Sequence, residues 1–87
     1  MQAFIVTSPG LPLDKRDLLE KAILMLSQAQ ENAPQQQIVL HGMNVCTDSE
    51  GSAVVLALLD GLPGWEQHVA DALEEGGLAF SRHYPGA

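Results

Sequence analysis

Residues 51–61, GSAVVLALLDG, can form either a strand or a helix, and the whole architecture follows from that choice. The run from 53 to 59 is apolar without a break, which is typical of a strand that is covered on both faces. A second extended run, QQIVLHGMNVC at 36–46, precedes it, and the residues between them favour a turn. We therefore expect a β-hairpin that is closed by the four-residue turn DSEG, residues 48–51.

The register of this hairpin follows if Thr47 pairs with Ser52. His41 then lies opposite Leu58, and the alternation of a strand divides the side chains between two faces. One face carries His41, Met43, Val45, Val54, Leu56 and Leu58. The other carries Ile38, Leu40, Gly42, Asn44, Cys46, Ala53, Val55, Ala57 and Leu59. Both faces of the second strand are apolar, so we expect neither to remain in water.

The remaining elements are indicated by the spacing of their apolar residues and by the glycines and prolines that end them. QAFIVTS, residues 2–8, predicts a strand that stops at a Pro-Gly pair. A helix follows from the N-cap Asp14 to about Asn32, with its apolar face on Leu18, Leu19, Ala22, Ile23, Leu26 and Ala29. A second helix over 63–75 buries Trp65, Val69, Ala72 and Leu73, and Gly76-Gly77 ends it. The alternating pattern of LAFSRHY, residues 78–84, predicts the last strand.

In order, these elements are strand, helix, strand, strand, helix, strand, which is the split βαβ arrangement of ferredoxin-like domains. This α+β reading predicts a four-stranded antiparallel sheet with two helices on one face and a single domain over 1–87. The other face of the sheet is then bare. We expect a second copy of the chain to cover it, sheet against sheet or by strand exchange at an edge, which makes the protein a homodimer.

A competing interpretation makes 52–60 a helix, capped by Ser49 or Ser52 and ended by Gly61. The order then implies a parallel α/β layer in three layers. In that form the chain resembles the sulfur-relay subunits of the DsrE type, through FIVTSPG at 4–10, HGMNV at 41–45, EEGG at 74–77 and LAFSRH at 78–83. The resemblance implies a sulfur-carrying cysteine in or after a later strand, where this chain has Ser81, Arg82 and His83. We do not adopt this family.

The charge of the chain limits its partners. Eleven acidic residues against four basic ones give a net charge of −7, which repels nucleic-acid phosphates and anionic lipid. We therefore expect neither direct nucleic-acid binding nor membrane binding. Residues 44–87 hold seven acids and only Arg82 as a base, which suits a protein partner with a basic surface. A single cysteine and the lack of a signal-peptide pattern indicate the cytoplasm.

His41, Met43 and Cys46 bring soft metal donors together in sequence. Strand alternation places Cys46 on the opposite face from the other two, so we expect no metal and no cofactor. Cys46 stays a candidate reactive thiol. The loop SPG at 8–10 lacks the lysine and glycine spacing of a phosphate-binding loop.

These observations favour a non-catalytic domain that works by self-association and by binding a protein or small ligand. The interface is expected on His41, Met43, Val45, Val54, Leu56 and Leu58, and no catalytic residue is assigned. The rival is a small-molecule enzyme, a monooxygenase or isomerase of the dimeric α+β barrel type. In that case His41, Met43, Trp65 or His68 would line a cavity between sheet and helices.

Overall fold

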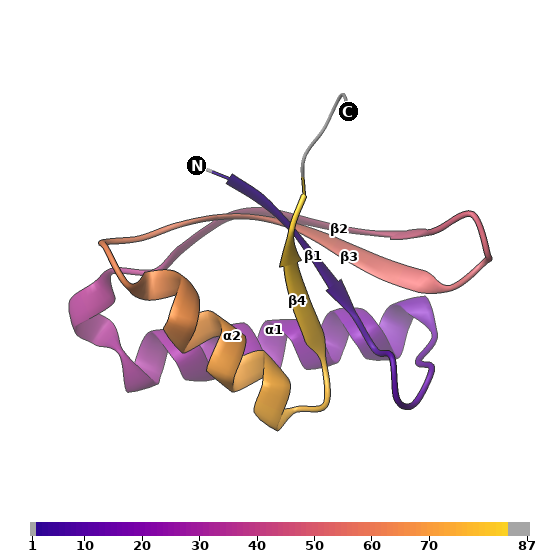
Figure 1. The fold of residues 1–87 in the computed structure, drawn as a ribbon, viewed down its shortest axis with the longest axis horizontal. Coiled ribbons are helices and arrows are strands. Elements are labelled where there is room, and N and C mark those ends of the chain that lie inside the picture. Colours follow the sequence, from indigo (N-terminus) through magenta and orange to yellow (C-terminus); the bar gives the residue numbers. More distant parts are fainter. Residues whose placement is uncertain (1, 84–87) are drawn as a thin grey trace.

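The computed structural model describes residues 2–83 and contains four strands and two α-helices (Figure 1). In chain order these are β1 (Gln2–Thr7), α1 (Lys15–Asn32), β2 (Val39–Thr47), β3 (Ala53–Asp60), α2 (Trp65–Glu75) and β4 (Ala79–Arg82). Tyr84, the last residue of the strand expected over 78–84, lies outside the described residues. The predicted order of elements is confirmed.

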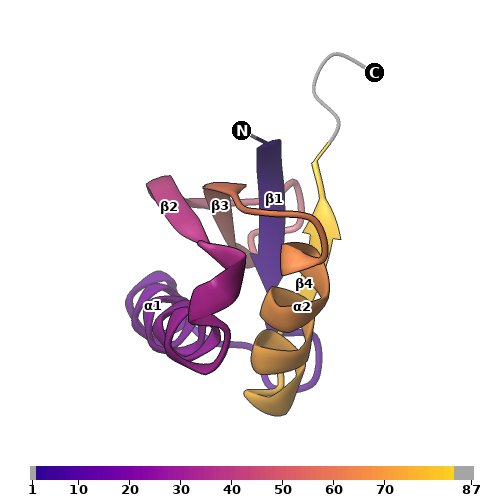
Figure 2. The same ribbon diagram turned by 90° about the vertical axis from the view of Figure 1, so that its left-hand side faces the viewer.

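The strands form one antiparallel sheet in the order β2-β3-β1-β4, with β3 and β1 at the centre. Figure 2 shows both helices on the same side of this sheet, with α1 on the side of β2 and α2 on the side of β4. This is the ferredoxin-like α+β fold that the sequence predicted. The helical interpretation of 52–60 is wrong, and the parallel α/β layer and the DsrE-type resemblance that depended on it fall with it.

The physical reason is the position of β3, which pairs with β1 on one side and β2 on the other. The backbone N–H and C=O groups of a central strand form hydrogen bonds with the strands on both sides, and its alternate side chains lie in the core. Val55, Ala57 and Leu59 are buried under the helices, which accounts for one half of the apolar run. The other half points to the uncovered side of the sheet.

The core lies between the sheet and the two helices. Phe4 packs edge-on against Trp65 with ring centroids 5.3 Å apart, and it stacks on Phe80 at 4.6 Å. The predicted stripe of α2, which comprises Trp65, Val69, Ala72 and Leu73, is buried. The sheet and the helices are therefore joined by a closely packed apolar layer.

Helix α1 begins where the sequence predicted. The carboxylate of Asp14 accepts a hydrogen bond from the backbone N–H of Asp17 at 2.8 Å, which caps the first turn. The predicted apolar face is partly wrong, because Ile23 is 46% exposed and Met25 is buried in its place. Met25 reaches toward the end of α2 near Gly76, whereas Ile23 lies outside the buried stripe of α1.

The segment before β2 is not extended from residue 36, as the sequence suggested. Pro34–Gln36 forms a turn of 3-10 helix, and Gln37 follows in the left-handed region at φ 52°. Proline favours the first position of such a turn, since it has no N–H to lose. The strand consequently starts at Val39 and continues to Thr47, one residue further than expected.

The hairpin register also differs from the prediction, by one residue. Thr47 pairs with Ala53, not Ser52, and a β-bulge between Leu40 and Gly42 takes up His41. The cause is Asp48, whose carboxylate accepts hydrogen bonds from the N–H groups of Glu50 and Ser52, both at 2.9 Å. This turn lengthens the loop by one residue, and a one-residue shift moves every side chain of a strand to the opposite face.

Candidate binding surface

The uncovered side of the sheet is the largest continuous apolar surface that the strand pairing produces. Because Phe4, Val6, Val55, Ala57 and Leu59 face the helices, their neighbours in each strand face away. We call this surface the open face. It consists of Ala3, Ile5, Gly42, Asn44, Cys46, Val54, Leu56, Leu58 and Ser81. None of these nine side chains is charged, and the charged residue Asp60 lies on the same side at the end of β3.

The structure brings together only half of the predicted interface. Val54, Leu56 and Leu58 lie side by side on the open face, as expected. Met43 and Val45 are instead half-buried against the core on the helix side of β2. The prediction that placed them with Leu58 is therefore wrong, and the extra residue in the Asp48 turn is the reason.

His41 does not sit opposite Leu58 either. It is the exposed extra residue of the β-bulge in β2, and Gly42 takes the position opposite Leu58. The sequence did not identify Ile5, Gly42, Asn44 and Cys46 as residues of this surface. The aspartate that opens the turn was the signal in the sequence, because an aspartate there often accepts hydrogen bonds from the N–H groups that follow it.

A hollow of about 280 Å³ lies within this surface. It is lined by Ala3, Gly42, Met43, Asn44, Leu56, Leu58 and His83. The missing side chain of Gly42 leaves room here, since a Cβ at this position would meet only the Cδ1 of Leu58, at 3.7 Å. Asn44 and His83 supply the hydrogen-bonding groups of an otherwise apolar lining.

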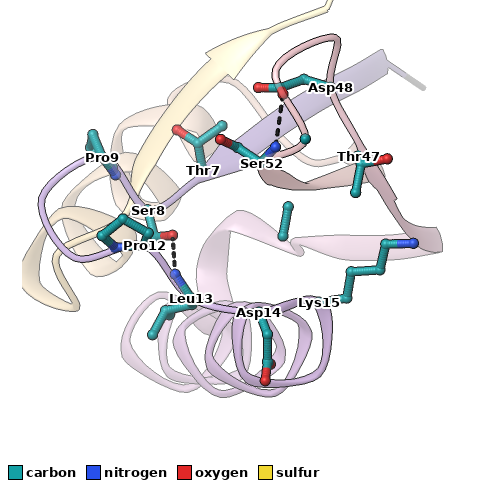
Figure 3. Close-up of a pocket in the computed structure, with 12 residues that line it drawn as sticks. Thr7, Ser8, Pro9, Pro12, Leu13, Asp14, Lys15, Thr47, Asp48 and Ser52 are labelled. Atoms are coloured by element: carbon teal, nitrogen blue, oxygen red, sulfur yellow. Dashed lines mark hydrogen bonds between the residues drawn. The ribbon is translucent and has the colours of Figure 1, made fainter.

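A larger cavity of about 560 Å³ lies between the start of α1 and the tip of the β2–β3 hairpin (Figure 3). It is lined by Thr7, Ser8, Pro9, Pro12, Leu13, Asp14, Lys15, Thr47, Asp48, Gly51, Ser52 and Ala53. Lys15 is its one basic side chain, and two carboxylates accompany it. The lining therefore carries both signs of charge with a net charge of −1, which is a weak basis for selecting a charged ligand.

The polar atoms of this cavity mostly hold the loops in place. Ser8 Oγ accepts from the N–H of Leu13 at 3.2 Å, which is drawn in Figure 3 together with the bond from Ser52 to Asp48. Asp14 is occupied by the helix cap. The cavity is therefore the junction of two loops, and Ser8, Asp14 and Asp48 in its lining already have structural partners.

The arrangement does not assemble the expected enzyme cavity. Trp65 is buried in the core against Phe4, and His68 is half-buried on α2. His41 lies on β2, at the opposite edge of the sheet from the strand that α2 accompanies. No group of three or more His, Cys, Asp or Glu side chains able to hold a metal ion exists among residues 2–83.

Most acidic side chains lie away from the open face, and Asp60 at the end of β3 is an exception. Glu66, Asp71, Glu74 and Glu75 lie on α2, and Asp48 and Glu50 lie at the hairpin tip. Glu66 is paired with Arg82 at 2.7 Å, and the Arg82 guanidinium also lies 6.0 Å from the centroid of Phe4. Most of the negative charge therefore lies on the helical side and at the hairpin tip, and association through the centre of the open face keeps these groups apart.

Helices long and apolar enough to cross a membrane are absent from the part of the chain that the structure describes. No protein-family model, no curated protein and no solved structure matches the chain.

Proposed function

We propose that this protein is a small non-catalytic ferredoxin-like domain whose activity is to associate with a second copy of itself through the open face. The main supporting observation is that the centre of this sheet face is apolar and uncovered, with Asp60 as the charged residue at its end, in a chain whose other surfaces are strongly acidic. Exposed apolar patches of this extent mark interaction sites in soluble proteins. The single cysteine favours the cytoplasm as the compartment.

A second copy fits this surface better than a charged partner does. A basic protein surface gains nothing from nine uncharged side chains, and it would lose its own hydration on them. A second copy presents the same aliphatic side chains, and stacked sheets interdigitate such side chains at about 10 Å separation. Leu58, at 41% exposed, is the most exposed apolar side chain on this surface and is expected at the centre of the interface.

The size of the surface sets the expected affinity. A four-stranded sheet with strands about 4.8 Å apart offers roughly 20 Å by 25 Å, or on the order of 500 Å² per copy. Two copies then bury on the order of 1,000 Å², which is near the lower limit for a specific interface. We therefore expect a reversible dimer with a dissociation constant in the micromolar range.

Two matched lysine substitutions test the proposal. Leu58→Lys places a charge on the open face, and Leu62→Lys places one in the loop after β3, where the parent side chain is 43% exposed. We expect Leu58→Lys to weaken association about ten-fold or more, because the ammonium is desolvated in the interface. Leu62→Lys should leave it unchanged. Sedimentation equilibrium is the measurement, and equal masses for both variants would refute the proposal.

A further inference from the structure

The outer edge of β2 is unprotected from Gly42 to Thr47, beyond the β-bulge at His41. The strand has nine residues, Val39–Thr47, and none of them is lysine, arginine, aspartate, glutamate or proline. Its partner in the described residues is β3 alone, so one row of its backbone groups is unpaired. Proteins usually blunt such edges with charges, proline or short strands. The opposite edge follows this rule, because β4 has only four residues and ends at Arg82.

The hairpin shows which backbone groups face outward. The N–H of Asp48 donates to the carbonyl of Ser52 at 2.9 Å, so these two residues form a hydrogen-bonded pair. Along an antiparallel ladder such pairs alternate with non-bonded ones. The N–H and C=O groups of Met43, Val45 and Thr47 therefore point away from β3 and toward solvent.

Apolar side chains lie beside this edge, on the side of α1, and we call Ile23, Met43 and Val45 the ledge. The side chains of Met43 and Val45 are half-buried there. The side-chain amide of Gln30 donates to the carbonyl of Ile38 at 3.0 Å, which fixes one side of α1 toward β2. Ile23 precedes Gln30 by seven residues, or two turns, and so lies on that same side with 46% of its surface exposed.

We propose that β2 pairs with β2 of a second copy, antiparallel, about a two-fold axis at Val45. This register pairs Val45 with itself and Met43 with Thr47 of the other copy, so all three outward residues exchange hydrogen bonds. The Ile23 side chains of the two copies cover the paired β2 strands on the helix side of the sheet. Figure 2 shows β2 at the outer side of the sheet, on the side of α1.

Polar complementarity at the ends of the pairing favours a second copy as the occupant. In this register the bulge residue His41 comes next to the hairpin tip of the other copy, which carries Asp48 and Glu50. The polar imidazole then meets acidic side chains at both ends of the paired strands. The paired sheets also make one continuous open face of double width. The edge pairing uses none of the open-face side chains, so it does not depend on the proposed function.

The experiment isolates the edge in the Leu58→Lys background, in which association through the open face is blocked. In this background Thr47→Pro removes an outward N–H at an exposed position. Ile23→Lys places a charge on the ledge and keeps a good helix former, so this variant tests the edge even if the proline variant fails to fold. Leu24→Lys is the matched control, since Leu24 is 56% exposed on the far side of α1.

The expected result is a dimer in the Leu58→Lys background that Ile23→Lys weakens about ten-fold or more and Leu24→Lys leaves intact. Amide hydrogen exchange at Met43, Val45 and Thr47 should slow with protein concentration, because only pairing protects those groups. A monomer at hundreds of micromolar, or rapid exchange at these three amides in the associated protein, overturns the edge pairing. If Ile23→Lys alone lowers the sedimentation mass of the otherwise wild-type protein and Leu58→Lys alone does not, the proposed function is refuted and the edge pairing is supported.

Discussion

Gly42 and Leu58 face each other across β2 and β3, and a Cβ added to Gly42 would stand 3.7 Å from the Cδ1 of Leu58. That distance is ordinary van der Waals contact. The glycine is therefore not required by the fold of the single chain, and its effect is to leave a hollow beside the most exposed apolar side chain of the open face.

The substitution Gly42→Ala should stabilise the monomer. Alanine restricts the unfolded chain and packs against Leu58, so we expect the free energy of unfolding to rise by about 0.5–1 kcal/mol. Urea unfolding at low protein concentration measures this without a contribution from association. A lower midpoint with an unchanged slope would show that the backbone at Gly42 is not free to accept a side chain.

The substitution Gly61→Ala should be strongly destabilising. A Cβ at this position would lie 2.6 Å from the Cβ and Cγ of Trp65, which is buried against Phe4 and has no room to withdraw. We expect a loss of about 2–3 kcal/mol, the usual range for overpacking a core side chain. Gly10→Ala is the control, since nothing lies within 4 Å of its added Cβ. Thermal unfolding of both variants checks the prediction, and similar melting temperatures would count against it.

The substitution Asp48→Ala should destabilise the hairpin. It leaves the N–H groups of Glu50 and Ser52 without the carboxylate that accepts from both. For an exposed turn we expect a cost of about 1–2 kcal/mol, as for the loss of a cap. Glu50→Ala changes the neighbouring carboxylate and keeps the Asp48 bonds, so it should cost much less. If the two variants unfold at the same denaturant concentration, Asp48 does not hold the register.

Cys46 should report on association, because it lies half-buried on the open face opposite Val54. We expect its alkylation by iodoacetamide to slow as protein concentration rises, since a second copy covers the thiol. In the Leu58→Lys variant the rate should not depend on concentration. A wild-type rate that is equally constant would mean that this part of the sheet stays open to solvent.

The fold was predictable from local signals that agree with one another. The Asp14 cap, the stripe of α2 and the apolar run of β3 each point to one element type, and their order leaves the ferredoxin-like topology as the solution. The ambiguity of 52–60 is resolved by tertiary structure. A central strand accepts apolar side chains on both faces when helices cover one of them, and no local pattern contains that information.

The residues of the open face were only half predictable, because they depend on the length of one turn. The sequence placed Val54, Leu56 and Leu58 together on one face correctly, since the side chains of β3 alternate whatever strand pairs with it. The assignment of Met43 and Val45 required the register, and the hydrogen bonds of Asp48 shift that register by one. The bulge at His41 likewise depends on how β2 and β3 pair, and no residue type in the strand predicts it.

The central claim is association through the open face, and methyl NMR during dilution tests it most directly. From millimolar to low micromolar concentration we expect the methyl resonances of Val54, Leu56 and Leu58 to shift together along one binding curve. The methyl groups of Leu11 and Leu62, which are exposed but lie outside the sheet, should stay in place. Open-face resonances that are constant over the whole dilution range would contradict the account.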